Sequence, residues 1–289
     1  MIYYILLIIV QILFGVNFVA SKIVVTSWSP FAFASLRFMA SGVIILLVLK
    51  LMGKSIVLKK EHWKSTFILA FVGFSLSQSC FLYGLSLTTA TNTALISSTI
   101  PLFIFLINRF RGVGSWSKTK LIGLIVSFIG VLVLRKIENF SLSDQGMLGD
   151  LLVLAACSSL AMMISLSSDY FQKVDPIIGS AHMFWVGGLL LLPLWLMNGF
   201  TFPVDAPAGF YSSLLFSIIG ATCLTYLFNN IALKRVDSDV VGLFIFLQPI
   251  VAAIFAYMTL GTQIEMRSLG AFLLILIGVN LVIKKPKAI

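Results

Sequence analysis

Long apolar runs separated by short polar stretches make up almost the whole chain. A helix needs about 20 apolar residues to cross roughly 30 Å of hydrocarbon. The segments that meet this requirement lie near residues 3–25, 31–50, 65–87, 92–109, 118–135, 149–169, 177–198, 208–233, 240–260 and 267–283. Breaks such as Asp175-Pro176 and Phe202-Pro203 separate several of them. The pattern predicts an all-α integral membrane protein with ten transmembrane helices.

Composition and charge strengthen the membrane assignment. Of the 289 residues, 60% are hydrophobic and 10% are charged, whereas an average soluble domain has about 45–50% and about 25%. A net charge of +10 would suggest nucleic-acid binding in a soluble protein, but here the basic residues lie between apolar runs, which favours loop topology. We therefore expect a lipid bilayer, and no nucleic acid, as a partner. The three cysteines fall inside apolar segments, without the spacing of a disulfide framework or a metal site.

The basic residues are unevenly divided between the two sides of the membrane. With the N-terminus placed inside, the outer loops hold only Arg135, Lys136 and Arg267, and Lys22 and Arg37 lie within helices. The remaining 15 of the 20 Lys and Arg residues fall in inner loops. Because cytoplasmic loops carry such an excess, the bias predicts a multi-pass protein of the cell inner (plasma) membrane with both termini cytoplasmic.

The chain also repeats itself at a nearly constant spacing. Pro30 and Pro176 are 146 residues apart, and Pro101 and Pro249 are 148 apart in similar local settings. Each half contains five predicted helices, an odd number, so the second copy must enter the membrane upside down. We predict two inverted five-helix repeats, residues 1–145 and 146–289. Inverted repeats recur in secondary transporters, whose substrate sites lie where the halves meet.

Several motifs resemble one family of membrane proteins. They are Phe14 to Lys22 (FGVNFVASK), Thr93 to Pro101 (TALISSTIP), Gly149 to Leu152 (GDLL) and Asn229 to Pro249. In order and spacing they resemble the EamA family of the drug/metabolite transporter superfamily, over nearly the whole chain. The resemblance implies ten helices in two halves, and export or uptake of amino acids and other small metabolites by alternating access, without a bound cofactor.

The sequence departs from that family in its carboxylates. Family members often carry a Gly-Glu pair after the fourth and ninth helices, where this chain has Gly114-Ser115 and Gly261-Thr262. All ten acidic residues can be assigned to loops or helix ends. Proton- and ion-coupled carriers typically place acids or His within the membrane. We therefore expect a facilitator or exchanger that selects a zwitterionic or anionic solute and depends weakly, or not at all, on a pH gradient. For the transport function as a whole, an exporter or a facilitator is expected.

Polar side chains inside the predicted helices are the candidate substrate-binding residues. Such groups are costly in hydrocarbon and usually face a bundle interior or a wet cavity. Large amides in particular need more hydrogen-bond partners than packing usually offers, although polar residues also join helices to one another. The predicted substrate-binding residues are Asn17, Arg37, Gln78, Ser97, Tyr226, Asn229, Asn230 and Gln248.

Arg37 is the most costly of these residues. It lies seven residues beyond Pro30, about 10 Å deep at 1.5 Å per residue, and no acid is predicted at its depth. It must reach water, a backbone carbonyl or a substrate anion, so a structural anchor and an anion contact both remain open. Lys22, near the outer end of the first helix, can snorkel to water.

Pro101 and Pro249 occupy equivalent positions within the fourth and ninth predicted helices. A proline inside a helix leaves a carbonyl four residues earlier unbonded and kinks the helix, here at Ser97 and Ile245. The pair is predicted either to form hinges beside the substrate site or to be static kinks.

These observations together predict a secondary-type transporter that moves a small polar metabolite, an amino acid or a similar solute, by alternating access. The only further partner expected is the bilayer, and the protein should be a monomer or weak dimer. A multidrug exporter is the alternative within transporters. A passive channel or an intramembrane enzyme is a more distant alternative, since the chain has no HExxH and no GxSxG motif.

Overall fold

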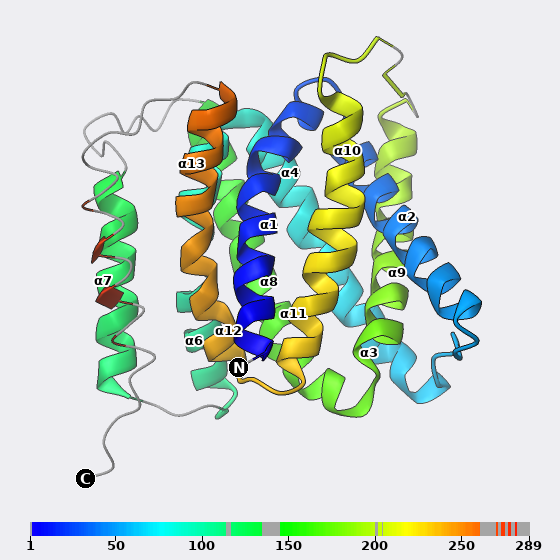
Figure 1. Cartoon of the computed structure of the whole chain (residues 1–289), viewed down its shortest axis with the longest axis horizontal. Coiled ribbons are helices and arrows are strands. Elements are labelled where there is room, and N and C mark those ends of the chain that lie inside the picture. Colours follow the sequence, from blue (N-terminus) through cyan, green and yellow to red (C-terminus); the bar gives the residue numbers. More distant parts are fainter. Residues whose placement is uncertain are drawn as a thin grey trace.

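The computed structural model describes residues 2–113, 117–134, 145–199, 202–203 and 205–260, and the isolated helical positions 270, 273, 274, 277, 278 and 281. Within these residues the protein is all helical and has no β-strand. The helices stand side by side along one direction (Figure 1).

The elements up to residue 134 are α1 (Ile2–Val25), α2 (Pro30–Leu51), the 3₁₀ turn η1 (Lys60–His62), α3 (Trp63–Ala70), the π-helical segment η2 (Phe71–Leu76), α4 (Ser77–Leu87), α5 (Ala90–Ser97), α6 (Ile100–Phe110) and α7 (Lys118–Leu134). The elements after residue 144 are α8 (Gln145–Lys173), α9 (Pro176–Met197), α10 (Phe210–Ile218), the π-helical segment η4 (Ile219–Leu224), α11 (Thr225–Leu233), α12 (Ser238–Phe244), the 3₁₀ turn η5 (Ile245–Leu247) and α13 (Gln248–Leu260).

Six helical runs in the described part are long and apolar enough to cross a membrane. They are Ile2–Val25, Pro30–Leu51, Lys60–Leu87, Gly146–Lys173, Pro176–Met197 and Phe210–Leu233. Large apolar side chains face outward along them, as on α1, where Ile5 and Ile12 are 48% and 46% exposed. Such faces would be a liability in water but suit lipid, so the chain is a multi-pass membrane protein. The predicted segment 267–283 lies mostly outside the described residues.

The fourth and ninth predicted segments are interrupted rather than continuous helices. The helix that begins at Ala90 ends at Ser97, and α6 starts at Ile100 with Pro101 in its first turn. In the ninth segment a 3₁₀ turn precedes α13, and Pro249 is the second residue of that helix. The fourth segment therefore breaks before Pro101, and the role of the two prolines as hinges or static kinks stays a prediction. Proline fits a helix start because the N–H it lacks would be unpaired there anyway.

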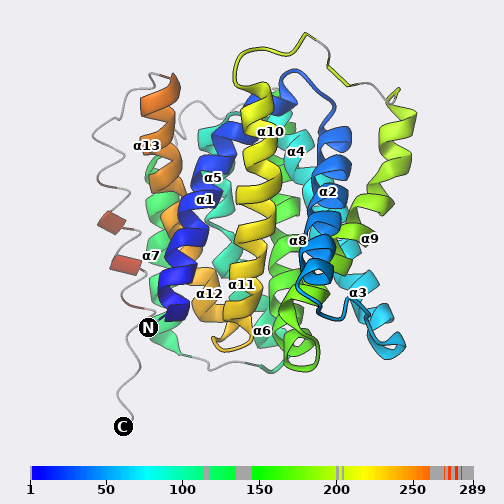
Figure 2. The ribbon, with the colours of Figure 1, turned by 45° about the vertical axis from the view of Figure 1, so that its right-hand side comes forward.

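Close helix crossings are built on glycine. A Cβ added to Gly42 of α2 would lie 2.9 Å from the Ala181 carbonyl, and one on Gly188 of α9 would lie 2.9 Å from the Ser35 carbonyl. Small residues let helix backbones approach in this way. An earlier part of α2, at Ser35, meets a later part of α9, at Gly188, and the later Gly42 meets the earlier Ala181. The two helices therefore cross antiparallel. They lie side by side in both views (Figures 1 and 2).

The helices α1 and α8 also run in opposite directions. Lys22, near the end of α1, donates to carbonyls at the end of α4. Gly149, near the start of α8, packs against Gly84 near that same end of α4, where an added Cβ would lie 2.7 Å from the Gly84 carbonyl. The end of α1 and the start of α8 therefore share one side of the molecule.

Candidate functional site

A central cavity of about 60 Å³ lies between α1, α2, α4, the α5–α6 break, α8, α11 and the start of α13. A buried water needs roughly 10–15 Å³, so the cavity has room for a few water molecules in this conformation. Polar side chains of α1, α2 and α4 face those of α11 and α13 across it, while α8 supplies a largely apolar wall that includes Cys157, Leu160 and Ile164.

Seven of the eight predicted substrate-binding residues line this one cavity. They are Asn17, Arg37, Gln78, Ser97, Tyr226, Asn229 and Gln248. Helical spacing explains the grouping within each element, because residues three or four apart share a face. Tyr226 and Asn229 are such a pair on α11, and Gln78 and Phe81 are another on α4.

Asn230 is the predicted residue that the structure does not bring into the lining. It is 1% exposed, and its Nδ2 donates to Ser180 Oγ of α9 at 2.7 Å. The next residue on a helix is turned by about 100°, so Asn230 packs α11 against α9 while Asn229 faces the cavity. Asn230 therefore forms a polar contact between α11 and α9.

Gln11 belongs to the lining although it is outside the predicted set. Its Oε1 accepts a hydrogen bond from Gln248 Nε2 at 2.6 Å, which joins α1 to α13 across the cavity. The available signal was spacing, since Gln11 precedes Phe14 and Phe18 by three and seven residues on the same face. The apolar wall from α8 had no such signal, because the sequence does not separate a cavity-facing Leu from a lipid-facing one.

Arg37 is the charged residue of the lining and is 2% exposed. Its Nη2 donates to Gln78 Oε1 at 2.6 Å. The rings of Phe33 and Phe38 lie 5.2 and 4.8 Å from Cζ, within range of a cation–π interaction. Within the described residues, Nε and Nη1 are buried without a hydrogen-bond partner, and no carboxylate pairs with the guanidinium.

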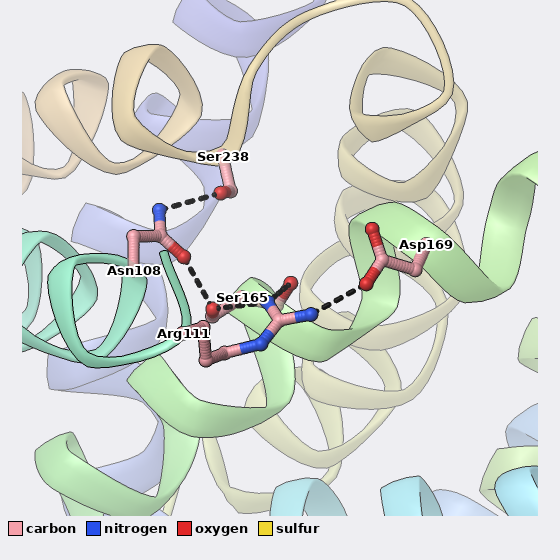
Figure 3. Close-up of polar contacts among 5 residues, drawn as sticks. All are labelled: Asn108, Arg111, Ser165, Asp169 and Ser238. Atoms are coloured by element: carbon pink, nitrogen blue, oxygen red, sulfur yellow. Dashed lines mark hydrogen bonds and ion pairs between the residues drawn. The ribbon is translucent and has the colours of Figure 1, made fainter. Parts of the chain in front are cut away.

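A polar cluster lies on one side of the cavity, toward the ends of α6 and α8 (Figure 3). Asn108 of α6 donates to Ser238 Oγ of α12 at 3.0 Å, and its Oδ1 accepts from Ser165 of α8. Arg111 donates to Ser165 Oγ at 2.8 Å and pairs with Asp169. Because Ser165 follows the cavity residue Ile164 directly, this cluster joins three helices immediately beside the cavity.

A second polar cluster lies toward the opposite ends of the helices. Lys22 Nζ donates to the carbonyls of Leu85 and Thr88 at 2.8 and 2.6 Å, and to that of Ser86. Thr88 Oγ1 in turn donates to Asp150 Oδ1 of α8 at 2.9 Å. Lys22 therefore caps the end of α4, where a cation complements the free carbonyls.

Two π-helical segments immediately precede cavity residues. Each has six residues, with η2 ending just before α4 and η4 just before α11. Gln78 and Tyr226 are each the second residue after such a segment. π-segments occur frequently at functional sites, and they rotate the residues that follow relative to a continuous α-helix.

Comparison with known proteins identifies the family. The sequence model of the EamA-like transporter family matches residues 1–136 and again residues 147–284. The chain belongs to this EamA-like transporter family. Among relatives, an uncharacterized transporter of Archaeoglobus fulgidus is 29% identical over 90% of both chains. The uncharacterized transporter YoaV of Bacillus subtilis is 25% identical, over 93% of this chain and 92% of its own.

A further relative and a solved structure extend the comparison. The uncharacterized inner membrane transporter YedA of Escherichia coli is 24% identical over 95% of this chain and 90% of its own. A solved crystal structure matches 96% of this chain and 95% of its own with a TM-score of 0.79. At 16% identity that match shows a shared fold alone. The family model and the named relatives together identify the protein as a transporter of this family.

Proposed function

We propose that this protein is a secondary transporter that carries a small polar metabolite, an amino acid or a solute of similar size, through the central cavity by alternating access. One observation carries the proposal: polar side chains from both halves of the sequence, including Asn17, Gln78 and Asn229, converge on one cavity between the helices. In this conformation the cavity measures about 60 Å³.

Two inverted five-helix repeats, residues 1–145 and 146–289, are part of this proposal, as are ten membrane crossings. Three features support them. The helices α2 and α9 both have 22 residues and begin at a proline. The π-segments η2 and η4 begin 148 residues apart, at Phe71 and Ile219. The opposite directions of α1 and α8 agree with an upside-down second half, and repeats of this kind are the usual basis of alternating access.

The two polar clusters are proposed to be the gates of the carrier. The cluster around Asn108 is adjacent to the basic loops, so it is the proposed cytoplasmic gate. The cluster of Lys22, Thr88 and Asp150 is the proposed outer gate. Each joins α8 to helices of the first half, and alternating access requires that one opens while the other stays closed.

The proposed orientation places the protein in the inner membrane with both termini in the cytoplasm. Ile56 lies in the loop between α2 and η1, where several lysines cluster. A cysteine at position 56 should therefore react with an impermeant maleimide from the cytoplasmic side only. Position 140, which is outside the described residues, should react from the outside only. The reverse pattern at either position contradicts this topology.

Counterflow in proteoliposomes tests the transport function. Vesicles holding wild-type protein and an unlabelled amino-acid mixture should take up a labelled amino acid with saturable kinetics and without an imposed gradient. Asn229→Leu should abolish this uptake in a folded protein, whereas Gln172→Leu, an exposed change at the end of α8, should leave it unchanged. Flux that never saturates contradicts a carrier and favours a channel, and absence of uptake for every amino acid contradicts the proposed solute class.

A further inference from the structure

Arg37 brings a positive charge into the cavity wall without a counter-ion among the described residues. Its guanidinium is buried, and Gln78, its one hydrogen-bond partner in the described part of the chain, is neutral. The polar groups that share the lining are amides and hydroxyls, including Asn229 and Gln248, and the described lining contains no carboxylate. A buried charge is strongly unfavourable unless it is paired. The positive charge of Arg37 is therefore not neutralised when the cavity holds no anion.

The guanidinium is held in a fixed plane by its neighbours. Gln78 Oε1 accepts from Nη2 at 2.6 Å, and Phe33 and Phe38 lie 5.2 and 4.8 Å from Cζ. Both rings are apolar and carry no net charge, so they position the guanidinium but do not cancel its positive charge. Among the described residues, the Nε and Nη1 donors have no hydrogen-bond partner and are covered by neighbouring side chains in this conformation. Orientation is therefore supplied by the protein, while two donor nitrogens lack an acceptor that a bound group can supply when the cavity widens.

The chemistry of these donors selects a carboxylate. Arginine presents planar N–H donors that match a carboxylate or phosphate, and a charge-assisted hydrogen bond is about twice as strong as a neutral one. A phosphate dianion would bring a second negative charge, for which the described lining offers no second cation. A cationic solute would meet like charge at Arg37. A small monocarboxylate, including the carboxylate of an amino-acid zwitterion, neutralises Arg37 with a single negative charge.

We propose that Arg37 is the anion subsite of the transport cavity, that its free donors bind the carboxylate of the solute, and that Gln78 positions the guanidinium. This assignment rests on the proposed function, in which the cavity is the solute path. It resolves the choice that the sequence leaves open for Arg37 in favour of the substrate contact.

Thermal unfolding of the purified full-length protein in detergent tests the subsite with matched solutes. Lactate and alanine carry a carboxylate, while lactamide has the size of lactate and no charge. A ligand that binds the folded state raises its apparent stability, so lactate and alanine should raise the unfolding midpoint and lactamide should not. Arg37→Gln should weaken lactate binding at least tenfold. A response to lactamide equal to that of lactate, or no response to either carboxylate, overturns the proposal.

Gln78→Glu gives a test that does not depend on the chosen solute. The new carboxylate would stand where Gln78 Oε1 now lies, 2.6 Å from Nη2, and would act as a built-in counter-ion. This variant should unfold at a higher temperature than the wild type and lose its response to lactate. The exposed change Ser65→Glu in α3 adds the same charge away from the cavity lining and should alter neither property. A Gln78→Glu protein that keeps the wild-type midpoint and lactate response overturns the proposal.

Separate measurements distinguish an error in the assignment of Arg37 from an error in the proposed transport function. If the subsite is wrong and the carrier is right, wild-type proteoliposomes will show saturable counterflow, while the purified protein responds to lactamide as it does to lactate. If the carrier is wrong, wild-type proteoliposomes will show no counterflow, while the unfolding midpoint of Gln78→Glu still reports whether Arg37 lacks a counter-ion.

Discussion

At the scale of single residues, position on the helix decides which polar side chain has a role in the cavity. Asn229 and Asn230 are adjacent and chemically identical, yet Asn229 lines the cavity and Asn230 bonds to Ser180. Sequence reasoning selected both, because a large amide in hydrocarbon needs partners wherever it points. The rotation of α11 that separates them depends on η4 and on packing against α9, and neither can be read from the local sequence.

This pair provides a matched test at the residue scale. Asn230→Ala should lower the free energy of unfolding by about 1 kcal/mol, the typical contribution of a lost hydrogen bond, and should leave the KM of counterflow unchanged. Asn229→Ala should raise KM or abolish transport with little loss of stability. Unfolding in detergent and counterflow in liposomes measure both properties. If Asn230→Ala changes KM while Asn229→Ala does not, the assignment of the two side chains is reversed.

At the scale of elements, the positions of the helices were predictable, and their interruptions were not. The apolar runs at 3–25, 31–50 and 177–198 match α1, α2 and α9 within one or two residues, because membrane thickness sets their length. The break before Pro101 and the π-segments were not foreseen. A proline reads equally as a kink or as a helix start, and a π-segment depends on tertiary packing rather than on a residue signature.

The glycine crossings make a prediction at this scale. Gly188→Ala should destabilise the protein by about 1–3 kcal/mol, the usual cost of overpacking. The new Cβ would lie 2.5 Å from Met39 Cγ and 2.7 Å from the Met39 backbone nitrogen, which would push α2 and α9 apart. Gly270→Ala meets no atom within 4 Å and is the matched control. Equal unfolding midpoints for the two variants would show that the crossing tolerates a wider spacing.

At the scale of the whole molecule, the cavity lies between two polar clusters that each connect α8 with the first half. If these clusters are gates, weakening one should favour the state open on that side. Asn108→Ala removes the hydrogen bonds to Ser238, Ser165 and Asp239. At about 1 kcal/mol each, their loss should shift the balance roughly tenfold or more toward the cytoplasm-open state.

The cavity residue Cys157 reports this shift. In a protein that lacks Cys80 and Cys223, an impermeant maleimide applied from the cytoplasmic side should label Cys157 faster in Asn108→Ala than in the parent. Asn198→Ala, an exposed asparagine at the end of α9, should label at the parent rate. Unchanged labelling in Asn108→Ala would show that this cluster does not close the cytoplasmic side.

Protection of Cys157 during transport tests the central claim, that the solute binds in this cavity, most directly. Cys157 is 2% exposed and lines the cavity, so a solute bound there should shield its thiol from maleimide. In proteoliposomes, an amino acid that supports counterflow should protect Cys157 with half-maximal effect near its KM, and an amino acid that is not exchanged should give no protection. Undiminished labelling of Cys157 at a saturating concentration of an exchanged amino acid would contradict the claim and place the solute path elsewhere.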